Sequence, residues 1–166
     1  MKKLFAAAAI YVLAGAAVAS AQTSGPVEPT LITSDGPLEM DNNKKVAIFD
    51  ENVVVIDAQG KVNADHMEVF FDKDNEIDHI YCKGNVKIDQ KERRSESDEA
   101  VYEAKNQKLI LTGNPVIKQG LDEYKAEKIT IFTAENRVIF EPSAQLVIYP
   151  DKNKDNSDLL VGDDEE

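Results

Sequence analysis

The chain has 166 residues, within the range of a single domain, and its 31 acidic and 19 basic residues give a formal net charge of −12 at pH 7. A chain this acidic repels the phosphate backbone of nucleic acids, so nucleic acid is excluded as a partner. The single cysteine, Cys82, excludes an intramolecular disulfide, and its even spacing from Ile80 and Val86 predicts a small buried side chain.

The first segment has the features of a secretory signal peptide. Lys2 and Lys3 give a positively charged start, residues 4–17 form an apolar run, and Ala19-Ser20-Ala21 is the small-residue pattern that signal peptidases recognise. We predict a signal peptide over residues 1–21, cleavage after Ala21, and a flexible N-terminal segment over residues 22–30. A retained N-terminal anchor helix is the alternative.

An internal repeat follows. Three asparagines recur at spacings of 33 and 29 residues, and an acidic residue follows each of them after 13 residues. The asparagines are Asn52, Asn85 and Asn114, the acids are Asp65, Asp98 and Glu127, and a further step of 29 residues reaches Ser143. Repetition at this period indicates a fold of stacked supersecondary units.

Apolar residues alternate on both sides of each marker. Ile80 and Cys82 precede Asn85, and Val86 and Ile88 follow it, so all four lie at odd offsets and share one face of an extended chain. The pattern predicts an all-β fold of repeated antiparallel strand pairs that form an elongated, slit-like or rolled sheet. One strand of each pair is expected to bend or bulge at its marker, and the terminal strands leave edges open for strand addition.

The remaining sequence indicates no catalysis, cofactor or metal site. Asp72 begins a calcium-loop-like pattern, but Ile77 stands where the loop needs glycine and Lys83 where it needs glutamate, so a hairpin turn is predicted. His66, predicted to be exposed, and His79 have no partner at metal-ligand spacing. We therefore assign residues 31–150 to the β-domain and residues 151–166 to an acidic disordered tail.

Several short motifs resemble the LptA/OstA-like N-terminal domain family of lipopolysaccharide-transport proteins. The resemblance starts in residues 32–72 and extends over about residues 31–149. It is carried by Ser34-Asp35, Asn52-Val53, Ala64-Asp65, Gly84-Asn85-Val86 and Ser97-Asp98. The sequence departs from the family pattern at Glu51, Pro115 and Glu127, where the family has Gly, Val and Asp. We expect these departures to loosen the bend or weaken strand pairing locally.

The resemblance implies a curved β-jelly-roll with an apolar groove that holds lipid A acyl chains. It implies a periplasmic lipopolysaccharide carrier that bridges inner-membrane and outer-membrane transport proteins of similar β-jelly-roll fold, with head-to-tail self-association. The groove candidates are the odd-offset residues Phe49, Val53, Val55, Met67, Val69, Ile80, Val86, Tyr102, Leu111, Ile129, Ile131 and Phe140. Lys91, Arg93 and Arg94 are candidates for lipid phosphates at the groove rim.

Each of these assignments has an alternative. A groove candidate can be an ordinary core residue, and the basic cluster can be a solvated hairpin tip. A second class of function also stays open, namely a structural β-solenoid scaffold or membrane-complex subunit that binds proteins through its edge strands without holding lipid.

Overall fold

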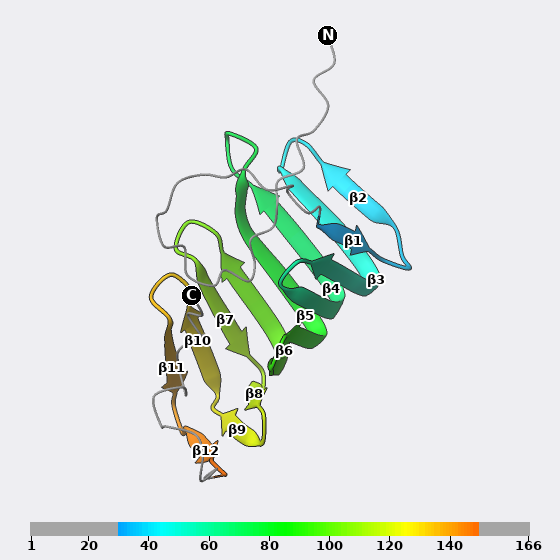
Figure 1. Cartoon of the computed structure of the whole chain (residues 1–166). Helices are drawn as coiled ribbons and strands as arrows, with labels where there is room; N and C mark the ends of the chain where they lie inside the picture. Colours follow the sequence, from blue (N-terminus) through cyan, green and yellow to red (C-terminus); the bar gives the residue numbers. More distant parts are fainter. Residues whose placement is uncertain (1–29, 150–166) are drawn as a thin grey trace.

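The computed structural model describes residues 30–149, which form one antiparallel sheet of twelve strands (Figure 1). The strands are β1 (Leu31–Thr33), β2 (Leu38–Asp41), β3 (Val46–Asp57), β4 (Gly60–Phe71), β5 (Ile77–Gln90), β6 (Arg93–Glu103), β7 (Lys108–Thr112), β8 (Val116–Gln119), β9 (Asp122–Lys125), β10 (Lys128–Phe132), β11 (Arg137–Glu141) and β12 (Gln145–Val147). Over this range, no helix has the length and apolarity needed to cross a bilayer.

The sequence predicts three segments at the two ends of the chain. The predicted signal peptide over residues 1–21, the acidic tail over residues 151–166 and nearly all of the segment over residues 22–30 lie outside the described residues. The calcium-loop-like segment that begins at Asp72 lies within the described residues, and it forms the turn between β4 and β5, as predicted. There, the Asp72 carboxylate accepts hydrogen bonds from the backbone N–H groups of Asp74 (2.8 Å) and Glu76 (3.0 Å).

The sheet divides into two leaves that share four long strands. Strands β3 to β6 run through both leaves, whereas the outer strands serve one leaf each: β1 and β2 both pair with β3, and β7 and β8 both pair with β6. The first leaf contains β2, β7, β10 and β11, and the second contains β1, β8, β9 and β12, each with its half of the long strands. Figure 1 shows the long strands at the centre and the short ones towards either end.

The leaves meet along a row of bulges and left-handed residues, which we call the corner line. Strand registers shift between Asp50 and Val53, and again between Lys83 and Val86, so two residues on one strand oppose one on the next. Corner-line residues with positive φ are Glu51, Asn52, Gly84, Asn85, Gly113, Asn114 and Ser143. The predicted bend at each marker is therefore confirmed.

Hydrogen bonds across the corner line explain the repeated asparagines and acids. The Asn85 side-chain amide donates to Asp65 Oδ2 at 2.8 Å. The same bond recurs in Asn52–Asp35 (2.9 Å) and Asn114–Asp98 (3.4 Å). Each marker asparagine thus contacts the corner acid that lies 16–20 residues before it in the chain. The acid 13 residues after an asparagine belongs to the next corner of the same bent sheet.

The expectation that Glu51 loosens the bend is wrong. Glu51 keeps a left-handed backbone, with φ of 65°, and its carbonyl accepts a hydrogen bond from the Asp35 N–H at 2.8 Å. The next residue, Gly36, donates its N–H to the Asp50 carbonyl at 2.9 Å, and the lack of a side chain permits this contact, because a Cβ there would lie 2.5 Å from the same oxygen. The small residue at this corner is thus Gly36, in the bend between β1 and β2.

Pro115 does interrupt strand pairing, as expected. Strand β7 ends at Thr112 and β8 begins at Val116, so the chain that would continue through the corner is divided there. Proline has no backbone N–H to donate to a sheet, and its ring fixes φ, which accounts for the break. At the last corner, the Glu127 N–H donates to the Pro142 carbonyl over a longer distance of 3.4 Å.

Candidate functional site

Rows of apolar side chains cross both leaves on their facing sides. Each leaf has one such row, in which every residue is the cross-strand neighbour of the next. The first row is Phe49, Met67, Cys82, Ala100, Leu111, Ile129 and Phe140, and the second is Val55, Val62, Ile88, Ser95, Ile117, Tyr124 and Leu146. The interior between the leaves is therefore apolar over nearly its whole length.

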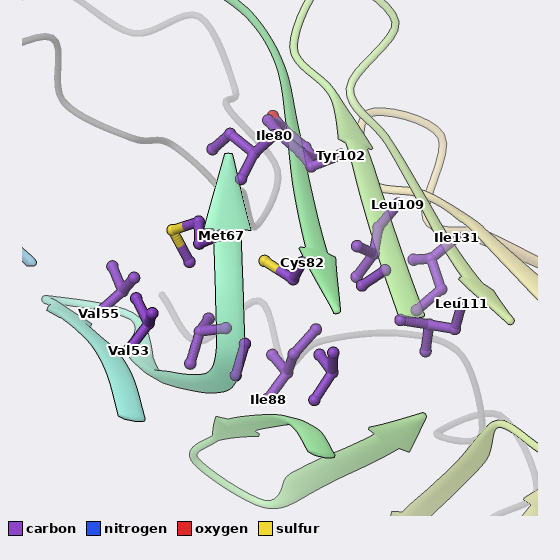
Figure 2. Packing of buried hydrophobic residues seen from close by; sticks show 14 of the residues in the cluster. Val53, Val55, Met67, Ile80, Cys82, Ile88, Tyr102, Leu109, Leu111 and Ile131 are labelled. Atoms are coloured by element: carbon purple, nitrogen blue, oxygen red, sulfur yellow. The ribbon is translucent and has the colours of Figure 1, made fainter. Parts of the chain in front are cut away.

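All twelve predicted groove residues lie on this interior side. Ten of them are buried, and Phe49 and Phe140 are partly buried against the same core. Figure 2 shows Met67, Cys82 and Ile88 pointing into one shared space, although Ile88 belongs to the second leaf. The sequence correctly places these side chains on one face, and their contact with lipid stays a prediction.

Interior residues that the prediction missed come from the start of each second strand. Val62, Ala64 and Tyr124 are buried, yet they lie at even offsets from their markers. The hairpin turn and the bulge each shift the inward–outward alternation of side chains by one residue. Odd offsets from the marker therefore cannot identify all the inward residues of a repeat. Counting back from each acid would have found them, since positions −1 and −3 are Ala64 and Val62 before Asp65.

The space left between the leaves is narrow. A cavity of about 20 Å³ lies between side chains of both leaves, which is room for about one water molecule. Its lining residues are Val55, Val62, Met67, Ile80, Cys82, Ile88, Ala100, Tyr102 and Leu109. This cavity is too small to hold an acyl chain.

An aromatic pair joins the two leaves near the C-terminal edge. Tyr124 of β9 and Phe140 of β11 stack across the two leaves, with ring centroids 5.8 Å apart. The Tyr124 hydroxyl is buried and has no hydrogen-bond partner in the described part of the chain, and burial raises the pKa of this phenol. A buried hydroxyl without a partner destabilises the fold by about 1–3 kcal/mol, so a ligand that accepts a hydrogen bond from it would be favoured.

Cys82 has the packing role that the sequence predicts. Its side chain is 6% exposed in the first-leaf row, opposite Met67 and Ala100. Burial raises the pKa of its thiol to about 12, so the thiolate is scarce at neutral pH and the residue is a poor nucleophile.

The outer face of the first leaf carries a charge cluster around His66. The prediction that His66 is exposed is wrong, because its side chain lies between two carboxylates and is 28% exposed. Nδ1 lies 2.5 Å from Asp50 Oδ1, and Nε2 lies 3.0 Å from Glu68 Oε1, while Lys83 stands opposite on β5. Hydrogen bonds to Asp50 and then Glu68 raise the pKa of His66.

This cluster predicts a pH-dependent contribution to stability. Because the folded-state pKa is raised, the stabilisation is complete below about pH 6.5, the unfolded value, and is lost as pH rises through the folded-state pKa. We expect His66→Gln to lower the free energy of unfolding by about 1 kcal/mol at pH 5.5 and by less at pH 8.5. Urea unfolding of both proteins at the two pH values measures this, and an equal difference at both would contradict it.

The basic residues predicted at the rim lie together at the β5–β6 hairpin tip. Lys91 is in the turn, Arg93 and Arg94 begin β6, and Arg94 forms an ion pair with Asp89. The alternative of a hairpin tip is therefore correct as a description of the backbone, and it leaves open what the side chains bind.

Both ends of the interior reach solvent. Leu38 and Met40 of β2 pair with the inward-facing Phe49 and Ala47, yet they are 54% and 50% exposed because no strand lies beyond them. At the other end, Leu146 of β12 pairs with the buried Tyr124 and is 50% exposed. These apolar edges, with the unpaired backbone groups of the outermost strands, can accept an added strand.

These features define an open, bent β-jelly-roll with an apolar interior between its leaves. Residues 31–137 match the family described as LptA/(LptD N-terminal domain) LPS transport protein, and the chain belongs to this family. No curated protein sequence matches the chain with statistical significance.

A solved structure has a similar fold. It is LptH from Pseudomonas aeruginosa, described as the LptA-homologous periplasmic component of the lipopolysaccharide transport device. The two share 19% sequence identity with a TM-score of 0.66, and the match covers 74% of this chain and 96% of LptH. The predicted fold class is thereby confirmed.

Proposed function

We propose that this protein is an exported periplasmic carrier that holds the lipid A acyl chains of lipopolysaccharide between its two leaves. The observation that supports this most is the continuous apolar interior, which reaches solvent at both edges of the sheet. Membership of a lipopolysaccharide-transport family supplies the class of ligand. The proposal includes a signal peptide cleaved after Ala21 and no catalytic step.

Lipid entry requires separation of the leaves, and the sheet topology favours this movement. The backbone hydrogen bonds run within each leaf, so parting the leaves breaks side-chain packing and leaves the strand ladders intact. Each acyl CH₂ removed from water contributes roughly 0.8 kcal/mol, so several chains offset the lost contacts between leaves. The lipid takes the place of one leaf as the packing partner of the other.

The edges suit partners of the same architecture. A strand added beside β1 or β2, or beside β11 or β12, satisfies the unpaired backbone groups and covers the exposed apolar side chains. We infer that inner-membrane and outer-membrane transport proteins of similar β-jelly-roll fold, or further copies of this chain, bind there head to tail. The apolar interior would then continue from one domain to the next.

Native mass spectrometry of the mature chain, residues 22–166, mixed with purified lipopolysaccharide tests the function. We expect a complex that survives size-exclusion chromatography. A lipid-free protein that still binds a partner domain through its edges would contradict the carrier function and support the scaffold alternative.

A further inference from the structure

A polar pocket at the end of the second leaf concentrates positive charge in an acidic protein. Its lining residues are Asp89, Gln90, Lys91, Glu92, Arg93, Arg94, Lys118 and Gly120, from the β5–β6 and β8–β9 hairpins. Four cations and two carboxylates give the lining a formal charge of +2, whereas the chain carries −12. This contrast points to a small anion as the ligand.

Arg93 stands where the apolar interior ends. It pairs with Gln90 across the hairpin, two residues beyond the buried pair of Ile88 and Ser95, so it lies on the inward side of the second leaf. Its guanidinium donates from Nε (3.2 Å) and Nη2 (2.7 Å) to the Gln90 side-chain oxygen. Gln90 therefore holds the guanidinium at the rim of the interior.

The charge of Arg93 is not neutralised within the described residues. None of the ion pairs there involves Arg93, Lys91 or Lys118. Burial lowers the pKa of Arg93, although a guanidinium stays charged at neutral pH. A half-buried cation without a carboxylate partner is unfavourable unless an anion approaches it.

Arg94 is different, although it lies next in sequence. It lies opposite Lys118 and lines the same pocket, where Asp89 pairs with it and raises its pKa. It already has its counter-ion, so its charge is less available to a ligand than the charge of Arg93. Within the basic cluster seen in the sequence, Arg94 is thus ion-paired and Arg93 is not.

We propose that this pocket binds a phosphate group of the lipid headgroup, with Arg93 as the bidentate donor and Lys91 and Lys118 as flanking charges. The inference rests on the proposed function, because acyl chains held between the leaves place their headgroup at this rim. A guanidinium matches two phosphate oxygens geometrically, and two ammonium groups balance the dianionic charge of a phosphomonoester.

The test measures affinity for three probes: lipid A with both phosphates, lipid A from which both phosphates have been removed, and inorganic phosphate. We expect Arg93→Gln to weaken binding of the phosphorylated lipid by about tenfold or more, since charged hydrogen bonds contribute about 1.5–3 kcal/mol. Binding of the dephosphorylated lipid should be unchanged. Lys87→Gln, which removes one positive charge from an exposed site outside the pocket lining, should alter both affinities by less than about twofold.

Several results would overturn the proposal. If Arg93→Gln weakened the binding of both lipids equally, Arg93 would only support packing. If wild-type protein bound both lipids with equal affinity, the phosphate would have no role in binding, and the proposed acyl-chain function would stay intact. Inorganic phosphate bound as tightly as the phosphorylated lipid would assign the pocket to free anions. If neither lipid binds wild-type protein, the proposed function itself fails.

A second variant keeps the test independent of folding. Lys118 is exposed, so Lys118→Gln should leave the unfolding midpoint unchanged and still weaken binding of phosphorylated lipid A selectively. If Arg93→Gln fails to fold, the absence of selective weakening in Lys118→Gln overturns the proposal.

Discussion

Replacing Leu111 by alanine is expected to lower the free energy of unfolding by about 4 kcal/mol. The Leu111 side chain is 0% exposed and lies in the first-leaf row between Ala100 and Ile129. Truncation leaves a cavity that strands on both sides cannot fill, because the sheet hydrogen bonds fix their spacing. Urea unfolding followed by circular dichroism measures the loss.

The same substitution at Leu121 is the control. Leu121 lies in the β8–β9 turn and is 77% exposed, so Leu121→Ala should change the free energy of unfolding by less than about 0.5 kcal/mol. Similar values for the two variants would show that the interior between the leaves is not packed as described.

Replacing Gly113 by alanine is expected to destabilise the fold by about 3 kcal/mol. Gly113 has φ of 73°, and a Cβ there would lie 2.4 Å from Asp98 Cβ. The left-handed backbone contributes about 1–2 kcal/mol of strain, and the overlap adds a similar amount, because Asp98 Cβ cannot swing away from its own backbone. The variant should also disturb the Asn114–Asp98 hydrogen bond at this corner.

Gly120 separates these two contributions. It has φ of 58°, and a Cβ there meets nothing within 4 Å, so Gly120→Ala should lose only about 1 kcal/mol, from backbone strain alone. Both variants are compared by urea unfolding. Equal losses would mean that the close approach at the corner line has no energetic consequence.

The repeat and its markers predicted the fold class and the bends correctly, because turn residues and alternation are local signals. Asn85 identifies a corner through its left-handed backbone, yet its bond to Asp65 joins two strand pairs, which no local pattern reveals. Tyr124 escaped prediction because a turn resets the alternation before it. The sequence also could not distinguish Arg93 from Arg94, since only the sheet places Asp89 beside one of them.

The interior residues were predictable as a set, and the width of the space between them was not. Alternation assigns Met67 and Ile88 to the inward side, but the gap between two leaves depends on how side chains from distant strands fit together. The narrow space at the centre of the interior makes leaf separation the central requirement of the proposed carrier function. Edge residues such as Leu38 and Leu146 already meet solvent, so entry can begin there.

Site-specific photo-crosslinking tests this requirement most directly. A diazirine analogue of leucine at Ile131, which is 5% exposed and faces the interior, should capture lipopolysaccharide on illumination. The same analogue at Lys87, which is exposed on the outer face of β5, should capture little. Capture at Lys87 without capture at Ile131 would contradict the account, because the lipid would then lie outside the sheet and the leaves would have no need to part.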